Sequence, residues 1–427
     1  MSCHEHSDLG ATGFIGSVVA ARLVADGHAV TGIGRNPARA RLKQPAIDWQ
    51  RADLSRMTKP ADWDEILKDQ HVVVNCAGAL QDGLSDDLSA TQAEAMLALY
   101  SAAKGSSRPL IVQISARTAG AAGDLPFLAT KRRADEALAA SGLPYLILRP
   151  ALVLGHNAHG GSALLRALAA FPLVLPLVHA ESPVETLSLD DVAEAVSRAV
   201  SGGISGDIDL AAAEVLTLAD LVRLHRQWLG LAPARVFALP RWLASPVTWL
   251  ADLSGLLGWR SPLRSTAMTI MSEGVRSLKA ESGLATTPAA ATLSANPSGV
   301  QDLWFARLYL LKPLVISGLS AFWLLSGLIP LLTLEKTSAH FLPFMPETAA
   351  TALTLATCLI DIALGAAVLL RPLAKRALLG MLAVSFAYLA GASLLEPALW
   401  LDPLGPLVKV LPSILLTLTA LSTLDER

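Results

Sequence analysis

The chain has 427 residues, of which 52% are hydrophobic and 16% charged, and its formal net charge is -2. Its mean hydropathy of +0.47 is too high for an ordinary soluble protein of this length, so part of the chain is expected to lie in a bilayer. A net charge of -2 and the lack of a Lys/Arg run offer no basic surface for nucleic acid, so nucleic acid is not a predicted partner. The three cysteines, Cys3, Cys76 and Cys358, lie far apart in the sequence, which predicts neither a disulfide framework nor a zinc site.

The first residues, "SCHEHSD", are polar and include no β-branched side chain. Cys3, His4, Glu5 and His6 have no second cluster to complete a metal shell, so we interpret them as a polar tail. The stretch lacks the positive start and apolar core of a secretory signal, so the first part of the chain is expected to stay in the cytoplasm.

The next stretch, "LGATGFIG", is rich in glycine and precedes apolar residues at helical spacing from 18 to 25. This pattern predicts a turn that seats a dinucleotide pyrophosphate on a helix N-terminus. The predicted contacts are Gly10, Thr12, Gly13, Phe14, Ile15 and Gly16.

Such a turn should follow a central strand, and the central strands of parallel sheets are continuous apolar runs. Burying the polar groups of "SCHEHSD" without partners would cost several kcal/mol. Our hypothesis from the sequence is that the true first strand is missing, through a shifted reading frame or a different start site. The intact sequence would then resume at about Leu9.

Up to about Gly230, short β-rich runs alternate with amphipathic helical patterns. Strands are predicted at 28–34, 71–78, 110–116 and 144–150, and helices at 16–26, 87–104 and 130–141. This alternation predicts an α/β fold for residues 1–230, a doubly wound parallel sheet of Rossmann type.

The strand predicted at 28–34 ends in "GIGRNPARAR", where a dinucleotide site meets the adenosine ribose. An acidic residue there would favour NAD, whereas Arg35 can pair with a 2'-phosphate. NADP(H) is therefore the predicted cofactor, with NAD possible. Arg39 and Arg41 lie close by, as further contacts or as solvated charges of a helix.

Between 231 and 302 the character of the sequence changes, because prolines recur and Trp242, Trp249 and Trp259 appear at helical spacing with leucines. Two alternatives remain open for this segment. It is a helix that lies on a membrane surface, or it is a helical cap over a substrate cleft.

The last part of the chain, 303–427, contains four apolar stretches of about the 20 residues that a spanning helix needs. They lie at 308–332, 348–370, 374–395 and 404–424. The second loop holds Arg371, Lys375 and Arg376, whereas the outer loops are mainly acidic. Because positive loops stay inside, the sequence predicts a multi-pass protein of the inner membrane with both termini and the nucleotide domain in the cytoplasm.

Asp361 falls near the middle of the second predicted span. A carboxyl group at that depth is expensive, and it predicts either a functional group or an interhelical hydrogen bond. Lys312 and Lys409 lie nearer the ends of their spans and are expected to reach the membrane interface. His225, in "LVRLHRQWLG", is expected on a helix surface.

Several motifs occur in a familiar order: "GATGFIG", "RADL", "VVVNCAG", "ISA", "FLATKRRAD" and "LRPALVLG". In order and spacing they resemble the short-chain dehydrogenase/reductase superfamily, most closely its atypical branch, which includes NmrA-like proteins and the nucleotide-binding accessory subunit of respiratory complex I. The match covers about residues 9 to 230. The membrane part resembles the DoxX-like four-helix family.

The resemblance implies a role for individual residues. The glycines would approach the pyrophosphate, Arg35 the 2'-phosphate, and Asp53 and Leu54 the adenine. Ala77 and Gly78 would contact the adenosine side of the cofactor. The implied catalytic positions are Ser115, beside the nicotinamide, and Lys131, on the nicotinamide ribose.

One departure from this family pattern affects the chemistry. Orthodox members carry a Tyr four residues before the Lys, where it transfers a proton, and this chain has Phe127 there. Either another group such as Thr130 supplies the proton, or the domain binds NADPH without reducing a carbonyl. The sequence therefore predicts a membrane-bound oxidoreductase acting on an apolar quinone or lipid, or a non-catalytic sensor or structural subunit of a membrane complex.

Overall fold

The computed structural model describes residues 5–78, 87–117, 121–276, 283–403 and 405–425. They form two compact units, Met1–Leu253 with Ser261–Ala306, and Ser254–Arg260 with Arg307–Arg427. Most of the segment 231–302 that the sequence sets apart thus lies in the first unit. Cys3 and His4 fall outside the described residues.

A seven-stranded parallel sheet forms the centre of the first unit, in the order β10-β6-β5-β4-β1-β2-β3. This is the order of a Rossmann fold, extended by one strand. The four strands that the sequence predicted are confirmed as β2, β4, β5 and β6. The sheet comprises β1 (Glu5–Leu9), β2 (Ala29–Gly34), β3 (Asp48–Arg51), β4 (Val72–Asn75), β5 (Leu110–Ile114), β6 (Tyr145–Pro150) and β10 (Gly206–Leu210).

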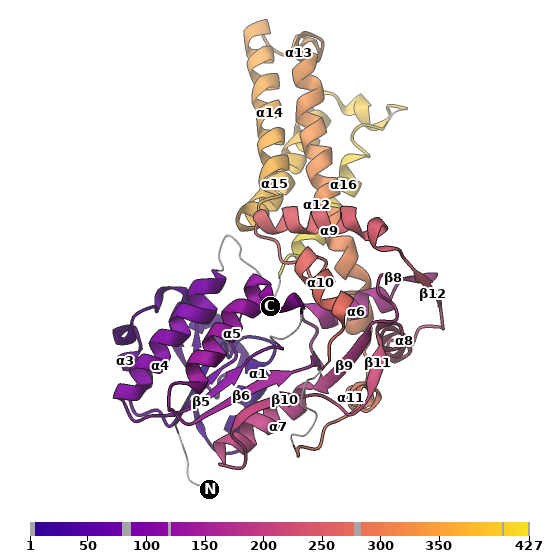
Figure 1. Ribbon diagram of the computed structural model, residues 1–427. Helices are drawn as coiled ribbons and strands as arrows, with labels where there is room; N and C mark the ends of the chain where they lie inside the picture. The colour runs from indigo at the N-terminus through magenta and orange to yellow at the C-terminus, as the bar shows by residue number, and fades with distance from the viewer. Residues whose placement is uncertain (1–4, 79–86, 118–120, 277–282, 404, 426–427) are drawn as a thin grey trace. The chain divides into compact units, whose positions relative to one another are not determined.

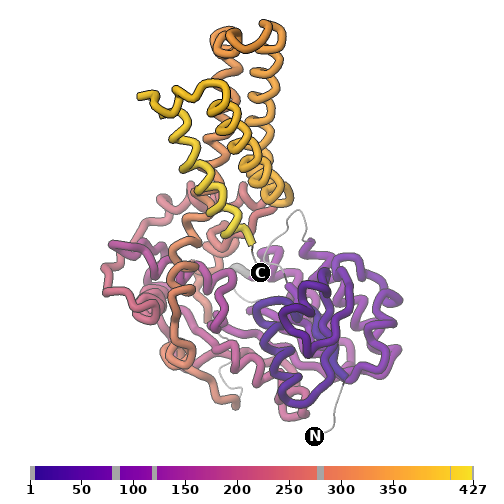
Figure 2. The backbone as a smooth tube through the Cα atoms, turned by 180° about the vertical axis from the view of Figure 1, so that it is seen from behind, coloured from indigo at the N-terminus to yellow at the C-terminus, as the bar shows by residue number. Residues whose placement is uncertain are grey.

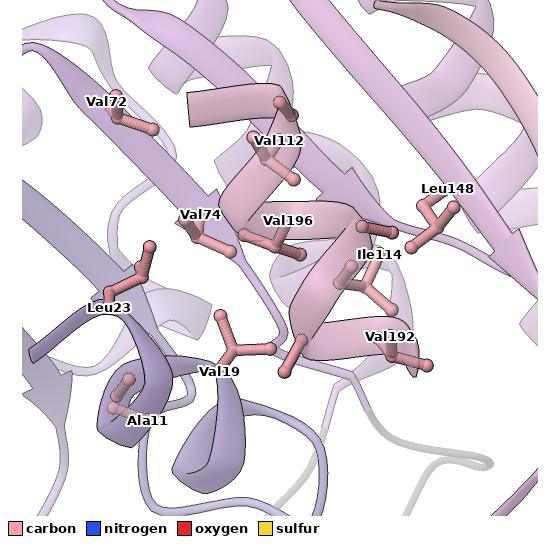
Figure 3. Packing of buried hydrophobic residues seen from close by; sticks show 14 of the residues in the cluster. Ala11, Val19, Leu23, Val72, Val74, Val112, Ile114, Leu148, Val192 and Val196 are labelled. Carbon is pink, nitrogen blue, oxygen red and sulfur yellow. The ribbon is translucent and has the colours of Figure 1, made fainter. Parts of the chain in front are cut away.

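Helices cover both faces of this sheet and make a three-layered domain (Figure 1). One face packs against α1 (Gly16–Ala25), α2 (Pro37–Lys43) and α7 (Leu189–Val200), and the other against α3 (Asp64–Leu67), α4 (Ala95–Gly105) and α5 (Pro126–Ala139). Figure 3 shows Val19 of α1 and Val196 of α7 beside Val74 and Val112 of the strands. The branched side chains of the strands fill the space between the layers, which explains their near-zero exposure.

Strand β1 corrects the expectation that the sequence before the glycine turn cannot supply the central strand. Glu5 and His6 belong to this strand rather than to a polar tail, and β1 pairs with both β2 and β4. His6, Ser7 and Asp8 are at most 1% exposed. These polar side chains are therefore buried in a central strand. The hydroxyl of Ser7 donates to the carbonyl oxygen of Ile66 at 3.5 Å, so the cost of unpaired burial falls on Asp8, whose carboxylate oxygens have no described partner.

The rest of the first unit consists of small sheets and helices. Two sheets, β11-β9-β7 and β12-β8, are formed by β7 (Leu152–Leu154), β8 (Val174–Leu177), β9 (Pro183–Ser188), β11 (Val215–Thr217) and β12 (Arg235–Ala238). The helices are α6 (Gly161–Ala169), α8 (Leu218–Trp228), α9 (Arg241–Leu256), α10 (Ser265–Glu273) and α11 (Ala289–Ala295). Strand β12 shows that the segment after 230 is not purely helical.

The larger part of the second unit, Arg307–Arg427, is mainly helical and is orange to yellow in Figure 2. Its helices are α12 (Val300–Leu332), which begins in the first unit, α13 (Leu334–Ser338), α14 (Glu347–Ala367), α15 (Arg371–Leu395) and α16 (Val410–Thr423). Helices α12, α14 and α15 are long and apolar enough to cross a membrane. The fourth predicted span is shorter than expected, because α16 has 14 residues and a length of about 21 Å against a hydrocarbon core of about 30 Å.

Candidate functional site

The glycine turn between β1 and α1 is tightly closed. Gly10 has a φ of 84°, and a Cβ on it would lie 2.9 Å from the backbone nitrogen of Ala77. A Cβ on Gly16 would collide with the carbonyl oxygen of Gly10, and the amide of Gly13 donates to that oxygen at 2.8 Å. Only glycine fits at positions 10 and 16, because a side chain would collide with backbone atoms of the turn and of the residues that follow β4. The turn leads into the N-terminus of α1, where the helix dipole favours an anion. The turn is therefore the candidate position for a pyrophosphate group.

Beneath this turn, Asp8 is fully buried on β1. Among the described residues, neither of its carboxylate oxygens has a hydrogen-bond partner. Burial raises the pKa of Asp8 well above its usual value. Burial also raises the pKa of the Cys76 thiol, with a further contribution from the charge of Asp8.

The expected adenosine contacts lie beside the glycine turn, because β2 and β3 are the next strands of the sheet. Arg35 is exposed just after β2. Asp53 follows β3 and accepts hydrogen bonds from the hydroxyl of Ser55 at 2.8 Å and from its amide at 3.3 Å. Leu54 beside it is half-buried, and Thr12 lies at the turn, with its methyl group 3.8 Å from a Cβ built on Gly34. The structure therefore brings Arg35, predicted to contact the 2'-phosphate, and Asp53, predicted to contact the adenine, to the carboxyl ends of two adjacent strands, β2 and β3.

On the other side of the turn, Lys131 reaches from α5 to the carboxyl ends of β4 and β5. Its Nζ donates to the carbonyl oxygen of Ile114 at 3.0 Å and lies 3.6 Å from a Cβ built on Gly78. Burial lowers the pKa of this ammonium group. Lys131 is 6% exposed, so it lies buried beside the ends of these strands and is not a solvated residue of the helix surface. Phe127 lies one turn earlier, with its ring centre 5.9 Å from Nζ.

Ser115 follows Ile114 and belongs to an ionic network that runs from the buried Asp135 to the exposed Asp207. Its hydroxyl donates to Oδ2 of Asp135 at 2.7 Å, and Nε of Arg149 donates to the same oxygen at 3.2 Å. Arg149 also pairs with Asp207 at 2.7 Å. Burial raises the pKa of Asp135, although the hydrogen bond from Ser115 and the charge of Arg149 oppose this shift. The sequence analysis missed Asp135, which lies four residues after Lys131 and so on the same side of α5.

A second feature missed from the sequence is the loop at 155–160, between β7 and α6. Its His159 stacks on Phe14 of the glycine turn, with ring centres 6.1 Å apart. Arg166 of α6 fixes this loop by donating to the carbonyl oxygens of Gly155 and His156 at 2.8 and 2.9 Å. An aromatic residue within the glycine motif is the sequence signal that could have indicated a contact of this kind.

Arg166 is itself held by distant parts of the first unit. It pairs with Asp302, in the first turn of α12, at 2.9 Å, and its guanidinium lies 4.5 Å from the ring centre of Trp228.

His225 of α8 is 1% exposed, so the expectation of a surface position is wrong. Burial lowers the pKa of His225 to about 4. Its Nδ1 lies 2.8 Å from the carbonyl oxygen of Leu221, which indicates a structural role.

The remaining candidate, Asp361, belongs to the second unit and is 4% exposed. Its carboxylate accepts hydrogen bonds from the hydroxyls of Ser326 on α12 and Tyr388 on α15, both at 2.9 Å. The interhelical hydrogen bond that the sequence offered as one alternative is thus present. The described residues contain no cluster of metal-ligating side chains.

Comparisons with known proteins agree with this division of the chain. Residues 10–201 match a family described as NAD(P)H-binding, and residues 320–418 match one described as DoxX-like. The structure of gox2253 superposes with a TM-score of 0.54 at 22% identity, covering 71% of this chain and 99% of that one. The Bordetella bronchiseptica enzyme WbmH, solved with NAD+, gives a TM-score of 0.51 at 18% identity, covering 69% and 97%. A search of curated proteins gave no match.

At 22% and 18% sequence identity, the similarity to these two structures shows the fold of the first unit only. Together with the family match over residues 10–201, it identifies the first unit as an NAD(P)H-binding domain with a Rossmann-type fold. The chain joins this domain to a C-terminal DoxX-like domain, whose apolar helices indicate association with a membrane.

Proposed function

We propose that the chain is a membrane-bound oxidoreductase that uses NADPH to reduce an apolar substrate, a quinone or a lipid. The observation that carries this proposal is the convergence of Gly78, Ser115 and Lys131 at the carboxyl ends of β4 and β5, next to the glycine turn. In a doubly wound sheet this edge is where ligands bind. The bound nicotinamide would supply a hydride, Lys131 would hold its ribose, and Ser115 would lie beside it.

The source of the proton decides which substrates suit this site. Phe127 cannot transfer a proton, and the hydroxyl of Thr130 donates to the carbonyl oxygens of Pro126 and Phe127, both at 3.0 Å. A quinone takes up one hydride and one proton to become a quinol, and water can protonate its oxygen. The substrate class that least requires the missing Tyr is therefore a quinone.

Arg35 supports NADPH rather than NADH. It is exposed at the end of β2, where the ribose of the adenosine half lies in this fold, and the sequence has no acidic residue there. Arg35→Ala should weaken NADPH binding about 5- to 30-fold, corresponding to the roughly 1 to 2 kcal/mol of a charge-assisted contact, and should leave NADH binding unchanged. Lys43→Ala, which removes an exposed positive charge at the last residue of α2, is the matched control.

The Trp-rich helix α9 supports a membrane location for the substrate path. Trp242 and Trp249 are 69% and 65% exposed, and Leu256 is 71% exposed, which favours contact with a membrane surface over a cap that buries these side chains. In the second unit, Trp259 donates to the carbonyl oxygen of Leu369 at 2.6 Å, so the chain just after α9 is attached to the end of α14. We propose that α9 lies in the membrane interface.

The same proposal places the protein in the inner membrane, with both termini and the NAD(P)H-binding domain on the cytoplasmic side. Arg371, Lys375 and Arg376 lie at the start of α15, and positive residues at helix ends remain in the cytoplasm. This orientation gives the domain access to cytoplasmic NADPH.

The test is a fluorescence titration of the purified full-length protein with NADPH and NADH, followed by addition of a soluble quinone. Tight NADPH binding with consumption supports the oxidoreductase. Binding without consumption of NADPH by any quinone or lipid tested refutes it, and an absence of binding refutes the nucleotide site altogether. Lys131→Met should abolish consumption, whereas the exposed Lys104→Met on α4 should not.

A second candidate function is an NADPH sensor or a structural subunit of a membrane complex. Phe127 favours it, because this position carries the proton-transferring Tyr in orthodox members of the resembled family. If this candidate is correct, Phe127→Tyr creates no activity, and NADPH binding instead raises the thermal stability of the protein without turnover.

A further inference from the structure

The buried face of α14 carries polar residues through the interior of the DoxX-like domain. The buried positions of this helix follow at intervals of three or four residues, namely Ala350, Thr354, Cys358, Asp361 and Gly365. Gly365 allows close packing, because a Cβ on it would lie 2.8 Å from the backbone nitrogen of Leu324 on α12. Asp361 is 4% exposed, so its carboxyl group is enclosed between helices and does not face lipid.

Three helices supply the surroundings of this carboxyl group. Ser326 of α12 donates to its Oδ2 and Tyr388 of α15 donates to its Oδ1, each at 2.9 Å. Its titratable neighbours are Tyr388 and, on α14 itself, Cys358. Within the described residues, no lysine, arginine or histidine forms an ion pair with Asp361. Since a hydroxyl can donate to a carboxylate or accept from a carboxylic acid, these partners suit both protonation states.

A cavity opens at the N-terminal end of the same helix. It has a volume of about 280 Å³ and is lined by Leu334, Glu335, Ser338, Leu342, Glu347 and Thr351. This volume holds several water molecules, and the carboxylates and hydroxyls of the lining offer them hydrogen-bond partners. The cavity is thus a polar space, large enough for several water molecules, between α13 and the N-terminal end of α14.

Hydroxyl groups continue along α14 from this cavity toward Asp361. Thr351 lines the cavity, Thr354 follows within one turn, and Thr357 donates to the carbonyl oxygen of Thr354 at 2.9 Å. Thr357 also contacts the hydroxyl of Tyr388, which bonds to Asp361. A polar group therefore occurs at each turn between the cavity and the buried carboxyl.

We propose that Asp361 is a proton-binding site of the DoxX-like domain, loaded from the cavity at the α13 end of α14. The carboxylate takes a proton from a hydronium ion of the cavity and becomes a neutral carboxylic acid, and the hydronium ion becomes water. Tyr388 and Ser326 hold the carboxyl in place in both states. This inference concerns the membrane domain alone and does not depend on the proposed oxidoreductase activity.

The test is pH-difference infrared spectroscopy of the full-length protein in proteoliposomes, which detects the carbonyl stretch of a protonated carboxyl group. Lowering the pH from about 9 to about 5 should produce a carboxylic acid band that is lost in Asp361→Asn. The band should shift in frequency in Tyr388→Phe, which removes one hydrogen bond. Glu347→Gln at the cavity should keep it. If the Asn variant does not accumulate in the membrane, Asp361→Glu provides the assignment by shifting the band.

Sidedness tests the second half of the proposal. In vesicles whose orientation is assigned by proteolysis of the NAD(P)H-binding domain, the band should follow the pH on the face that carries α13. Thr354→Val should slow this response, and Thr419→Val, on an exposed face of α16, should not. Two results would overturn the proposal. The first is that no carboxylic acid band of Asp361 changes with pH, and the second is that the band follows the pH of the opposite face.

Discussion

Replacing Asp8 by Val should stabilise the NAD(P)H-binding domain. The carboxyl group is buried on a central strand, and neither oxygen has a described hydrogen-bond partner. Burying an unpaired polar group costs about 1 to 3 kcal/mol, even when the group is neutral. Val removes this cost and adds apolar contacts to the cluster that contains Val30 and Val74.

The pH dependence of this gain follows from the raised pKa of Asp8. Below the usual Asp pKa of about 3.9, the carboxyl is protonated in the folded and unfolded chains, and only the cost of polar burial separates the variant from the wild type. As the pH rises, the unfolded chain ionises while the folded chain keeps its proton, so the wild type loses about 1.4 kcal/mol per pH unit. The advantage of Asp8→Val therefore grows with pH until the folded carboxyl also ionises.

The assay is thermal unfolding of the full-length protein in detergent from about pH 5 to about pH 8, followed by tryptophan fluorescence. A gain of about 3 kcal/mol corresponds to roughly 6 to 12 °C in a domain of this size. Asp8→Asn should lose the pH dependence but keep the cost of polar burial, and Ser7→Val, on the opposite face of β1, should show no pH-dependent gain. NADPH affinity should rise with stability. A melting temperature of Asp8→Val that parallels the wild type at every pH would refute the reasoning.

Three further predictions concern the same domain. Gly10→Ala should abolish NADPH binding in a fluorescence titration, whereas Gly27→Ala, which shares a positive φ but has open space around it, should bind normally. Arg166→Met should leave the buried carboxylate of Asp302 without its ion-pair partner and lower the free energy of unfolding by about 3 to 5 kcal/mol. It should also weaken NADPH binding, because Arg166 holds the loop at 155–160. An unchanged melting temperature would contradict this prediction. His225 should make a contribution of about 3 kcal/mol to stability that is lost as the pH falls from about 6.5 to about 4, because the unfolded chain protonates its histidine first. The measurement is the difference in unfolding free energy between the wild type and His225→Leu, which should shift by about this amount across the window, since the opposite pH dependence of Asp8 is common to both proteins.

Local patterns were sufficient for most of the sheet and for the glycine turn. The apolar runs of β2, β4, β5 and β6 and the helices between them are visible in the sequence, because burial on both faces requires such runs. Strand β1 was not predictable in this way. Its polar residues become a strand because β2 and β4 pair with it from both sides, and these pairings come from residues far along the chain.

The sequence by itself determined which residue types are predicted to approach a nucleotide, the presence of Phe127 where the resembled family carries a Tyr, and the presence of a carboxyl group within an apolar helix. Only the tertiary structure decided their partners. Ser115 meets Asp135, Arg166 meets Asp302 across 136 positions, and Asp361 meets hydroxyls from two other helices. The physical reason is that the spacing of apolar residues along the sequence indicates which face of a single helix or strand is buried. These partners instead depend on how elements that are distant in the sequence pack against each other.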